Sequence, residues 1–191
     1  PTLSVEPGRA ISGPPGTALY TVGTVKTVEL GGGTSRRYIS VDGGMTDNPR
    51  YALYGSKYTV FLANRAGEEA NFRCDVVGRC CESGDIIQPD VLLPEPKRGD
   101  LIAVCTTGAY NYSMASNYNR IPRPPVVMLK GGKPTLAVRR ETAGRAVGIQ
   151  LGGVRRRTAP APLHRGEGLA GLEFAAALGQ GLEIDGEHCG L

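Results

Sequence analysis

Residues 18–41 read ALYTVGTVKTVELGGGTSRRYISV and give the clearest indication of the fold. Residues 18–22 and 25–30 are rich in β-branched and aromatic side chains, which favour strands. The three glycines that follow, Gly31 to Gly33, are typical of a hairpin turn. Residues 38–41 then form a short returning strand. The stretch therefore predicts a β-hairpin near the start of the chain.

Further short strands are predicted on the C-terminal side of this hairpin, each bounded by Gly, Pro, Asn or Asp. They cover residues 58–63, 72–77, 85–93 and 100–105, and a second hairpin joins 126–130 to 136–139 through the turn at 131–133. Strands at this spacing are typical of a β-sandwich or a Greek-key barrel. We expect one mainly β domain over residues 16–142.

Composition agrees with this reading. The chain has 191 residues, of which 40% are hydrophobic and 21% are charged, and it contains 28 Gly, 14 Pro and no Trp. The length suits one ordinary domain that can bury a core without disulfides or metal. The many Gly and Pro residues favour short strands and turns over long helices.

Charge and cysteine usage exclude several classes of protein. The net charge is +4, and the only dense basic run, Arg155 to Arg157, stands beside Pro-rich sequence, so we expect no nucleic-acid partner. No apolar run approaches the roughly 20 residues of a membrane helix, and no secretion signal is visible. The five cysteines have no framework spacing, which indicates reduced thiols in a cytoplasmic protein.

The region 143–191 differs from the rest. It is rich in Gly, Ala, Arg and Leu, and the alternation of β-branched residues stops there. We expect a poorly ordered tail, which trypsin cuts at Arg155 to Arg157 before it cuts the β-domain.

Four stretches are unusual for a plain β-domain: Glu6–Arg9, Asp42–Tyr54, Cys80–Asp85 and Gly108–Asn119. Taken singly, they can be a turn, a loop, a buried thiol pair before a surface acid, and an aromatic strand end. The cysteines lack the CxxC spacing of a zinc site, so no metal is expected. Both histidines lie in the tail, which excludes a Ser-His-Asp or Cys-His mechanism in the β-domain.

Taken together and in this order, the four stretches resemble the pyridoxal-phosphate decarboxylases that combine an alanine-racemase-like barrel with a C-terminal β-domain. Glu-Pro-Gly-Arg and Gly-Ala-Tyr are common to that wider group. Cys-Glu-Ser-Gly-Asp, with Asn-Pro-Arg upstream and Ser-Met-Ala-Ser-Asn-Tyr-Asn downstream, is similar to the diaminopimelate decarboxylase family. The resemblance covers residues 1 to about 142.

This resemblance implies pyridoxal 5′-phosphate as cofactor and decarboxylation of meso-2,6-diaminopimelate to L-lysine as the reaction. The cofactor absorbs the electron pair left by CO₂. Glu6 would pair with its pyridine nitrogen, and Gly8, Arg9 and Tyr110 would contribute to its binding. Cys81 would return a proton to the carbon that loses CO₂, because an ordinary thiol is mostly protonated at neutral pH.

The resemblance also implies the substrate contacts. The distal carboxylate of diaminopimelate suits the bidentate guanidinium groups of Arg9 and Arg50, and Tyr54 can add a hydroxyl. Glu82 suits the distal ammonium, and Tyr110 would touch both substrate and cofactor. The resemblance further implies a homodimer with shared active sites, in which Cys81 would reach the site of the partner subunit.

Residues 1–15 are expected to be the end of the cofactor-binding barrel, including its last strand. In the family, the lysine and the glycines that bind the cofactor precede Glu-Pro-Gly-Arg. This chain should therefore be inactive alone. A barrel half, if it is encoded separately, would be its partner. Gly31 to Gly33 are then only a hairpin turn.

Two alternatives remain open at this point. One is a decarboxylase for another diamino acid, against which Glu82 and Arg50 argue, because the polyamine-forming relatives usually carry a shorter Asp at the acid position. The other is a non-catalytic β-domain that dimerises or binds a partner.

Overall fold

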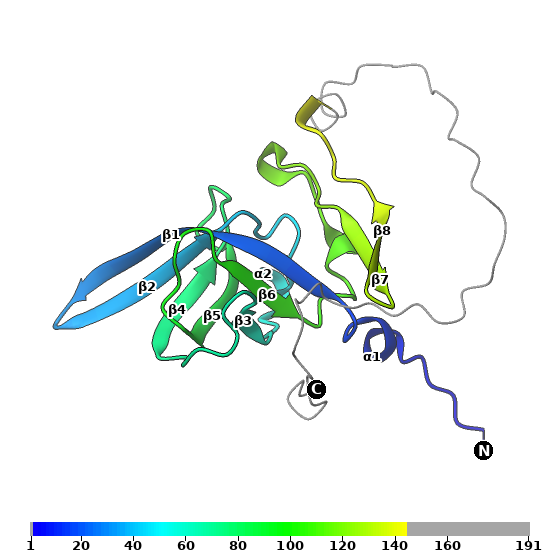
Figure 1. The fold of residues 1–191 in the computed structure, drawn as a ribbon, viewed down its shortest axis with the longest axis horizontal. Helices are drawn as coiled ribbons and strands as arrows, with labels where there is room; N and C mark the ends of the chain where they lie inside the picture. The colour runs from blue at the N-terminus through cyan, green and yellow to red at the C-terminus, as the bar shows by residue number, and fades with distance from the viewer. Residues whose placement is uncertain (1, 145–191) are drawn as a thin grey trace.

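The computed structural model describes residues 2–144 (Figure 1). Two short helices and eight strands follow one another in these residues. They are α1 (Gly8–Ser12), β1 (Thr17–Gly31), β2 (Thr34–Val41), α2 (Arg50–Tyr54), β3 (Val60–Leu62), β4 (Phe72–Val77), β5 (Ile86–Leu93), β6 (Leu101–Cys105), β7 (Val126–Lys130) and β8 (Lys133–Val138). Two 3₁₀ turns, Tyr112–Met114 and Tyr118–Arg120, lie between β6 and β7. The mainly β class is thus confirmed.

Six strands form one sheet in the order β3-β6-β1-β2-β4-β5. All neighbours are antiparallel except β2 and β4, which are parallel. The sheet curls until its edge strands β3 and β5 approach each other. At this seam the Gln88 side chain accepts a 2.8 Å hydrogen bond from the Tyr58 backbone N–H. The result is a nearly closed barrel, one of the two architectures that the strand spacing predicted.

The first hairpin is confirmed, with one difference. Residues 17–31 form a single strand with a register shift between Val22 and Val25, where the sequence predicted two strands. Gly23 lies at this irregularity, and the Thr24 N–H donates to the Ser40 hydroxyl at 2.8 Å. The first part of β1 pairs with β6 and the remainder with β2, so the strand passes from the barrel into a projecting ribbon (Figure 1).

The glycines at the tip of this ribbon explain the turn. Gly31, Gly32 and Gly33 all have φ between 61° and 85°, a conformation that side chains disfavour. The second hairpin, β7–β8, turns in the same way at Gly131 and Gly132 and forms a separate two-stranded sheet. Both glycine turns were therefore interpreted correctly.

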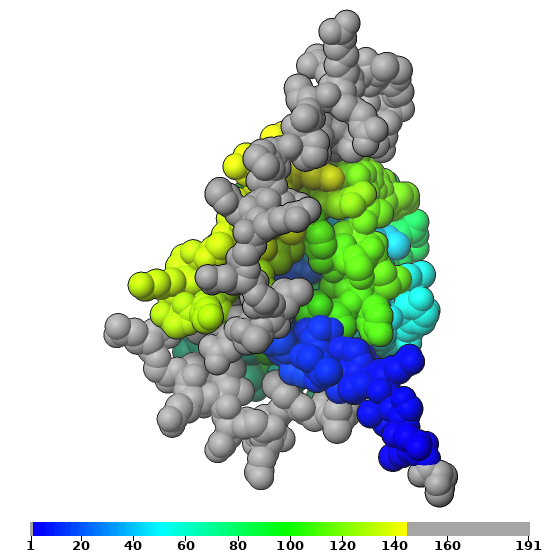
Figure 2. All heavy atoms as spheres, turned by 90° about the vertical axis from the view of Figure 1, so that its right-hand side faces the viewer, coloured from blue at the N-terminus to red at the C-terminus, as the bar shows by residue number. Residues whose placement is uncertain are grey.

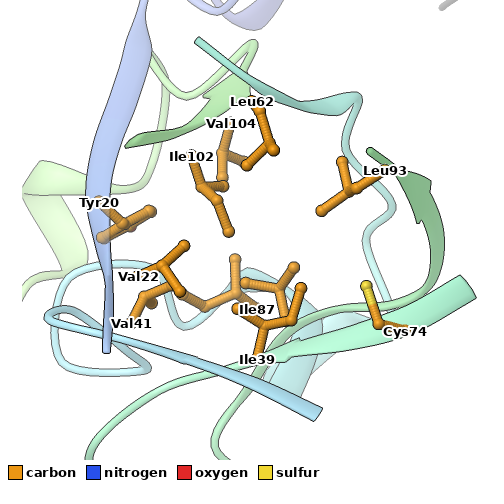
Figure 3. Close-up of a cluster of buried hydrophobic side chains, with 11 residues drawn as sticks. Tyr20, Val22, Ile39, Val41, Leu62, Cys74, Ile87, Leu93, Ile102 and Val104 are labelled. Atoms are coloured by element: carbon orange, nitrogen blue, oxygen red, sulfur yellow. The ribbon is translucent and has the colours of Figure 1, made fainter. Parts of the chain in front are cut away.

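The core fills the barrel with alternate residues of each strand (Figure 3). Burial of these apolar side chains is the main source of stability. The cluster consists of Tyr20, Val22, Ile39, Val41, Leu62, Cys74, Val76, Ile87, Leu93, Ile102 and Val104.

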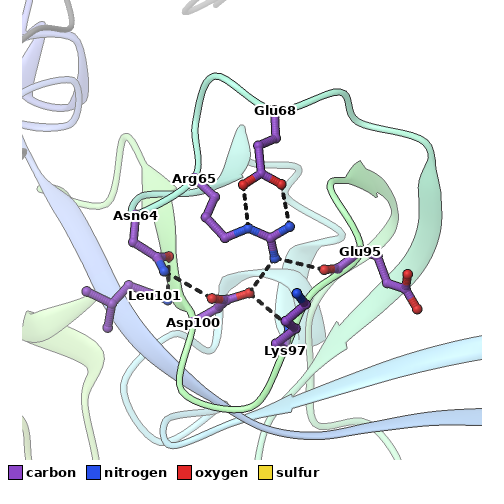
Figure 4. Close-up of polar contacts among 7 residues, drawn as sticks. All are labelled: Asn64, Arg65, Glu68, Glu95, Lys97, Asp100 and Leu101. Carbon is purple, nitrogen blue, oxygen red and sulfur yellow. Dashed lines mark hydrogen bonds and ion pairs between the residues drawn. The ribbon is translucent and has the colours of Figure 1, made fainter.

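A polar network fastens the loop after β3 to the loop before β6 (Figure 4). Asp100 is buried and accepts hydrogen bonds from Arg65 at 3.0 Å, Asn64 at 3.0 Å and the Lys97 N–H at 2.8 Å. Arg65 also pairs with Glu68. Two long connections of the barrel are thereby held together.

The expectation that residues 1–15 end a cofactor-binding barrel, including its last strand, stays a prediction. Residues 2–7 have no regular secondary structure, and α1 follows them. A strand of a parallel barrel receives its hydrogen bonds from neighbouring strands. The described residues provide no such neighbour for this segment. The expected tail and its tryptic sites lie outside the described residues, apart from 143 and 144.

Candidate active site

Arg50 lies at the start of α2, directly after Pro49. Its guanidinium carbon is 4.6 Å from the centre of the Tyr54 ring and 5.3 Å from that of Tyr110. Gly55 ends the helix in the left-handed conformation, with φ of 63°. One turn of helix therefore places Tyr54 beside Arg50, while Tyr110 comes from the loop after β6.

The backbone of that loop is sharply bent. Thr106 and Tyr110 have φ of 61° and 65°, which is uncommon for residues other than glycine. Gly108 packs against the end of α1, where an added Cβ would lie 1.9 Å from the Ser12 carbonyl oxygen. The bend and this close approach present the Tyr110 ring at the surface, where it is 48% exposed.

Cys81 and Glu82 form a second group, on the loop between β4 and β5. Both residues are exposed. The Cys81 backbone N–H donates to the Asn119 side-chain oxygen at 2.9 Å. The Tyr118 hydroxyl donates to a Glu82 carboxylate oxygen at 3.4 Å, and the negative charge of Glu82 raises the pKa of Tyr118.

Asp85 fastens this loop from inside. Its buried carboxylate accepts the backbone N–H groups of Cys80 and Met45, both at 2.6 Å. A Cβ at Gly44 or Gly78 would come within 2.6 or 2.2 Å of the same carboxylate. Asp85 therefore joins the loop that carries Cys81 to the loop that precedes Arg50.

Burial also distinguishes the two neighbouring thiols. Desolvation, together with the charge and the hydrogen bond of Asp85, raises the pKa of Cys80 to about 11. Cys80 is therefore protonated at neutral pH and partly shielded, whereas Cys81 is exposed. Of the pair, Cys81 is the thiol that a bound molecule can reach.

The predicted residues thus form two groups and a remainder. Arg50, Tyr54 and Tyr110 come together, and Cys81 and Glu82 come together, but within residues 2–144 no hydrogen bond, ion pair or cation–π contact runs directly from one group to the other. The remainder comprises Glu6, Gly8 and Arg9, which are exposed at α1. Figure 2 shows the N-terminal part of the chain (blue) below green parts of the β-domain, with the yellow β7–β8 hairpin visible on the same face.

Sequence reasoning did not assign roles to Asp85, Tyr118 or Asn119. All three stand within the stretches that it singled out, but their contacts depend on loops that meet only in the fold. The positive φ of Asn119, 51°, is equally invisible in the sequence. Asn is, however, among the residues that adopt this conformation most readily.

Neither of two surface cavities coincides with the whole predicted site. One of about 430 Å³ lies between the start of β1 and β7, and no predicted site residue lines it. A shallow depression of about 610 Å³ does contain Cys81, together with Arg79 and residues 119–122. In the described part of the chain, no cluster of His, Cys, Asp or Glu could hold a metal, and no helix is long and apolar enough to cross a membrane.

Comparison with known proteins gives a consistent result. Residues 14–108 match the family model described as pyridoxal-dependent decarboxylase, C-terminal sheet domain. The diaminopimelate decarboxylase of Bacillus subtilis is 52% identical over 151 residues, which cover 79% of this chain and 34% of that protein. The Mycobacterium tuberculosis protein of the same name is 49% identical, with coverage of 79% and 34%.

A solved structure agrees in fold. The diaminopimelate decarboxylase of Helicobacter pylori complexed with L-lysine has a TM-score of 0.67 and 34% identity, and the match covers 76% of this chain and 34% of that one. The chain therefore spans about a third of the length of the relatives that it matches.

Proposed function

Because residues 14–108 belong to the C-terminal sheet domain of the pyridoxal-dependent decarboxylases, we propose that this chain supplies part of a lyase active site. The proposed reaction removes CO₂ from meso-2,6-diaminopimelate and yields L-lysine. The names of the similar proteins support this substrate, as does the L-lysine complex of the Helicobacter pylori structure.

The proposal depends mainly on the surroundings of the Arg50 side chain. Its guanidinium is half-buried over two aromatic rings and forms no ion pair with any of residues 2–144. A guanidinium without an ion-pair partner in these residues has N–H donors to offer to a carboxylate from outside the chain. The distal carboxylate of diaminopimelate is such a group, and the Tyr54 hydroxyl can add a hydrogen bond to it.

The side chains of several described residues have the chemistry that pyridoxal phosphate requires. The exposed Tyr110 ring offers a flat surface with a polar end, and the exposed Glu6 offers a carboxylate for a pyridine nitrogen. Gly8 and Arg9 would bind the cofactor next to Glu6. When bound, the cofactor supplies the electron sink for the pair released with CO₂.

The protein's own residues then handle protons and charge. The Cys81 thiol donates a proton to the carbon that has lost CO₂. Glu82 accepts hydrogen bonds from the distal ammonium, and Tyr118 keeps its carboxylate in place. Arg50 holds the other charge at the distal end, so the substrate is fixed by two opposite charges.

The separation of the two groups supports a homodimer with shared sites. Arg50, Tyr54 and Tyr110 would serve one active site, while Cys81 and Glu82 of the same chain would serve that of the partner subunit. The exposure of Cys81 and Glu82 supports this arrangement, because both side chains remain open to a second chain. A cytoplasmic location is part of the proposal and is supported by the reduced thiols of Cys74, Cys80 and Cys81.

Steady-state kinetics on an assembled enzyme test the proposal. The chain would be joined to the N-terminal two thirds of the Bacillus subtilis relative, and lysine formation would be measured. Cys81→Ala should lower kcat by about 10²-fold or more with KM nearly unchanged. Arg50→Ala should mainly raise KM, by about 10- to 100-fold, because it removes a charge-assisted contact.

Arg98→Ala is the matched control for the loss of a positive charge, because Arg98 is exposed and lies on the loop before β6. It should leave both constants within about twofold. A folded, cofactor-loaded assembly without decarboxylase activity would instead support the non-catalytic β-domain. Full turnover by Cys81→Ala would overturn the assigned role of the thiol.

A further inference from the structure

The loop after β6 contacts the candidate site through two neighbouring residues, Tyr118 and Asn119. Asn119 accepts the backbone N–H of Cys81 at 2.9 Å through its side-chain oxygen. Tyr118 donates its hydroxyl to the Glu82 carboxylate at 3.4 Å. The loop after β6 therefore holds the thiol-bearing residue by its backbone and the acid by its side chain.

The backbone around Asn119 supports a specific placement. Asn119 and Arg120 have φ of 51° and 59°, in the left-handed region. Two consecutive residues other than glycine adopt this conformation only where the surroundings fix it. Here it directs the Asn119 amide toward the Cys81 loop.

The same segment is anchored to the first group of site residues. It begins at Tyr110, whose ring lies beside Arg50. Farther along, the Ser116 N–H donates to the Thr46 carbonyl at 2.8 Å, on the loop that leads to Arg50. Residues 110–119 thus connect the Arg50 group to the Cys81 group.

The Cys81 loop is consequently fixed from two sides. Asp85 binds the backbone of Cys80 from the interior, and Asn119 binds that of Cys81 from the surface. The depression around Cys81 has Asn119 in its wall, together with Arg79, Arg120, Ile121 and Pro122. The thiol therefore stays accessible although its backbone is held.

We propose that Asn119 and Tyr118 are positioning residues, which rests on the proposed function of Cys81 and Glu82. Asn119 fixes the backbone from which the Cys81 thiol delivers its proton, and Tyr118 fixes the carboxylate that binds the distal ammonium. The rate of a proton transfer depends strongly on placement, and an error of about 1 Å can cost about 10²-fold. Neither residue touches the reacting atoms.

The first test uses this chain alone and reads the Cys81 backbone. Asn119→Gly removes the acceptor but suits a positive φ, so the loop conformation is not penalised. The Cys81 amide should then exchange its hydrogen about tenfold faster, as the loss of one hydrogen bond implies. Asn119→Asp keeps an acceptor oxygen and should restore slow exchange.

Asn71→Gly is the matched control, because Asn71 is an exposed asparagine on the loop before β4. It should leave Cys81 exchange unchanged. Equal exchange in wild type and Asn119→Gly would overturn the positioning role of Asn119, whatever the enzyme does.

The second test uses the assembled enzyme and separates kcat from KM. Asn119→Gly should lower kcat by about 10- to 100-fold with KM within about twofold, and Asn119→Asp should recover most of it. Tyr118→Phe should raise KM by about threefold with kcat nearly unchanged. Wild-type kinetics in both variants would overturn the proposal. An inactive wild-type assembly would refute the proposed function, and the amide exchange would still decide on Asn119.

Discussion

The interior of the barrel and the loops at its rim differ in what surrounds their side chains. Val22, Ile39 and Ile102 in the interior are at most 1% exposed and are covered by this chain alone. Tyr54 and Tyr110 on the loops are 62% and 48% exposed, and Cys81 is also exposed. The core of the barrel is therefore covered by this chain itself, whereas we propose that the exposed candidate site is one side of a larger site.

This difference implies that stability and activity depend on separate residues. Residues of the interior should determine whether the chain folds, and residues of the rim should determine what the assembled enzyme does. The polar networks share features of both regions. Asp100 and Asp85 are buried like the interior residues, but they hold the loops of the rim in place. The following predictions test this separation, beginning with the largest effect.

The largest effect is expected for Ile102→Ala. Ile102 is 0% exposed, so the change leaves a cavity in the core and should lower the free energy of unfolding by about 2–5 kcal/mol. Leu136→Ala is the control, because Leu136 is 55% exposed and should cost less than about 1 kcal/mol. Urea denaturation measures both. Similar losses for the two variants would contradict a core that this chain completes.

A smaller effect is expected for Asp100→Asn. The change weakens a buried acceptor of three hydrogen bonds and should cost about 1–3 kcal/mol at neutral pH. Asp90→Asn breaks an exposed ion pair with Arg73 and should cost at most about 0.5 kcal/mol. An equal loss of unfolding free energy in both variants would show that the network in Figure 4 stabilises the fold no more than an exposed ion pair does.

The contribution of Asp100 to the free energy of unfolding should depend on pH. Burial alone would raise the pKa of Asp100, but hydrogen bonds from Asn64, Lys97 and Arg65 outweigh it and hold the pKa below its usual value. A lowered folded-state pKa stabilises the fold above the unfolded value, near pH 4, and this stabilisation is lost as pH falls through the folded value. Asp100→Asn should therefore lose less stability on acidification than wild type does.

The sequence accounts for much of the barrel and little of the site geometry. β4 covers residues 72–77 as predicted, because alternation and flanking turns are local signals. The continuity of β1 through Gly23 was not predicted, since it depends on pairing with β6 and β2. The contact between Asn119 and Cys81 spans 38 positions, so only the fold brings these residues together.

Thiol reactivity gives a prediction in the alkaline range. Desolvation raises the pKa of Cys74 to about 12, and desolvation with Asp85 raises that of Cys80 to about 11. Alkylation near pH 8.5 should label Cys81 well before Cys74 or Cys80, as peptide mass spectrometry would show.

The two buried thiols also predict a change of stability with pH. Because the folded-state pKa values of Cys74 and Cys80 are raised, the contribution of these thiols to stability should decline as pH rises from about 8.5 toward 11 and 12.

The smallest effect on stability is expected at the rim. Arg50→Ala removes two ring contacts and should cost no more than about 1 kcal/mol of unfolding free energy. Thermal denaturation of the isolated chain would show whether this holds. A loss as large as that of Ile102→Ala would mean that Arg50 serves mainly to stabilise the fold.

The most direct test of the account is active-site complementation in the assembled enzyme. Arg50→Ala and Cys81→Ala enzymes, each nearly inactive under the assay conditions, would be dissociated, mixed in equal amounts and reassociated. If Arg50 and Cys81 of one chain serve different active sites, each mixed dimer regains one intact site, and the mixture should recover about a quarter of wild-type activity. No recovery, with mixed dimers demonstrated by mass spectrometry, would contradict the shared site.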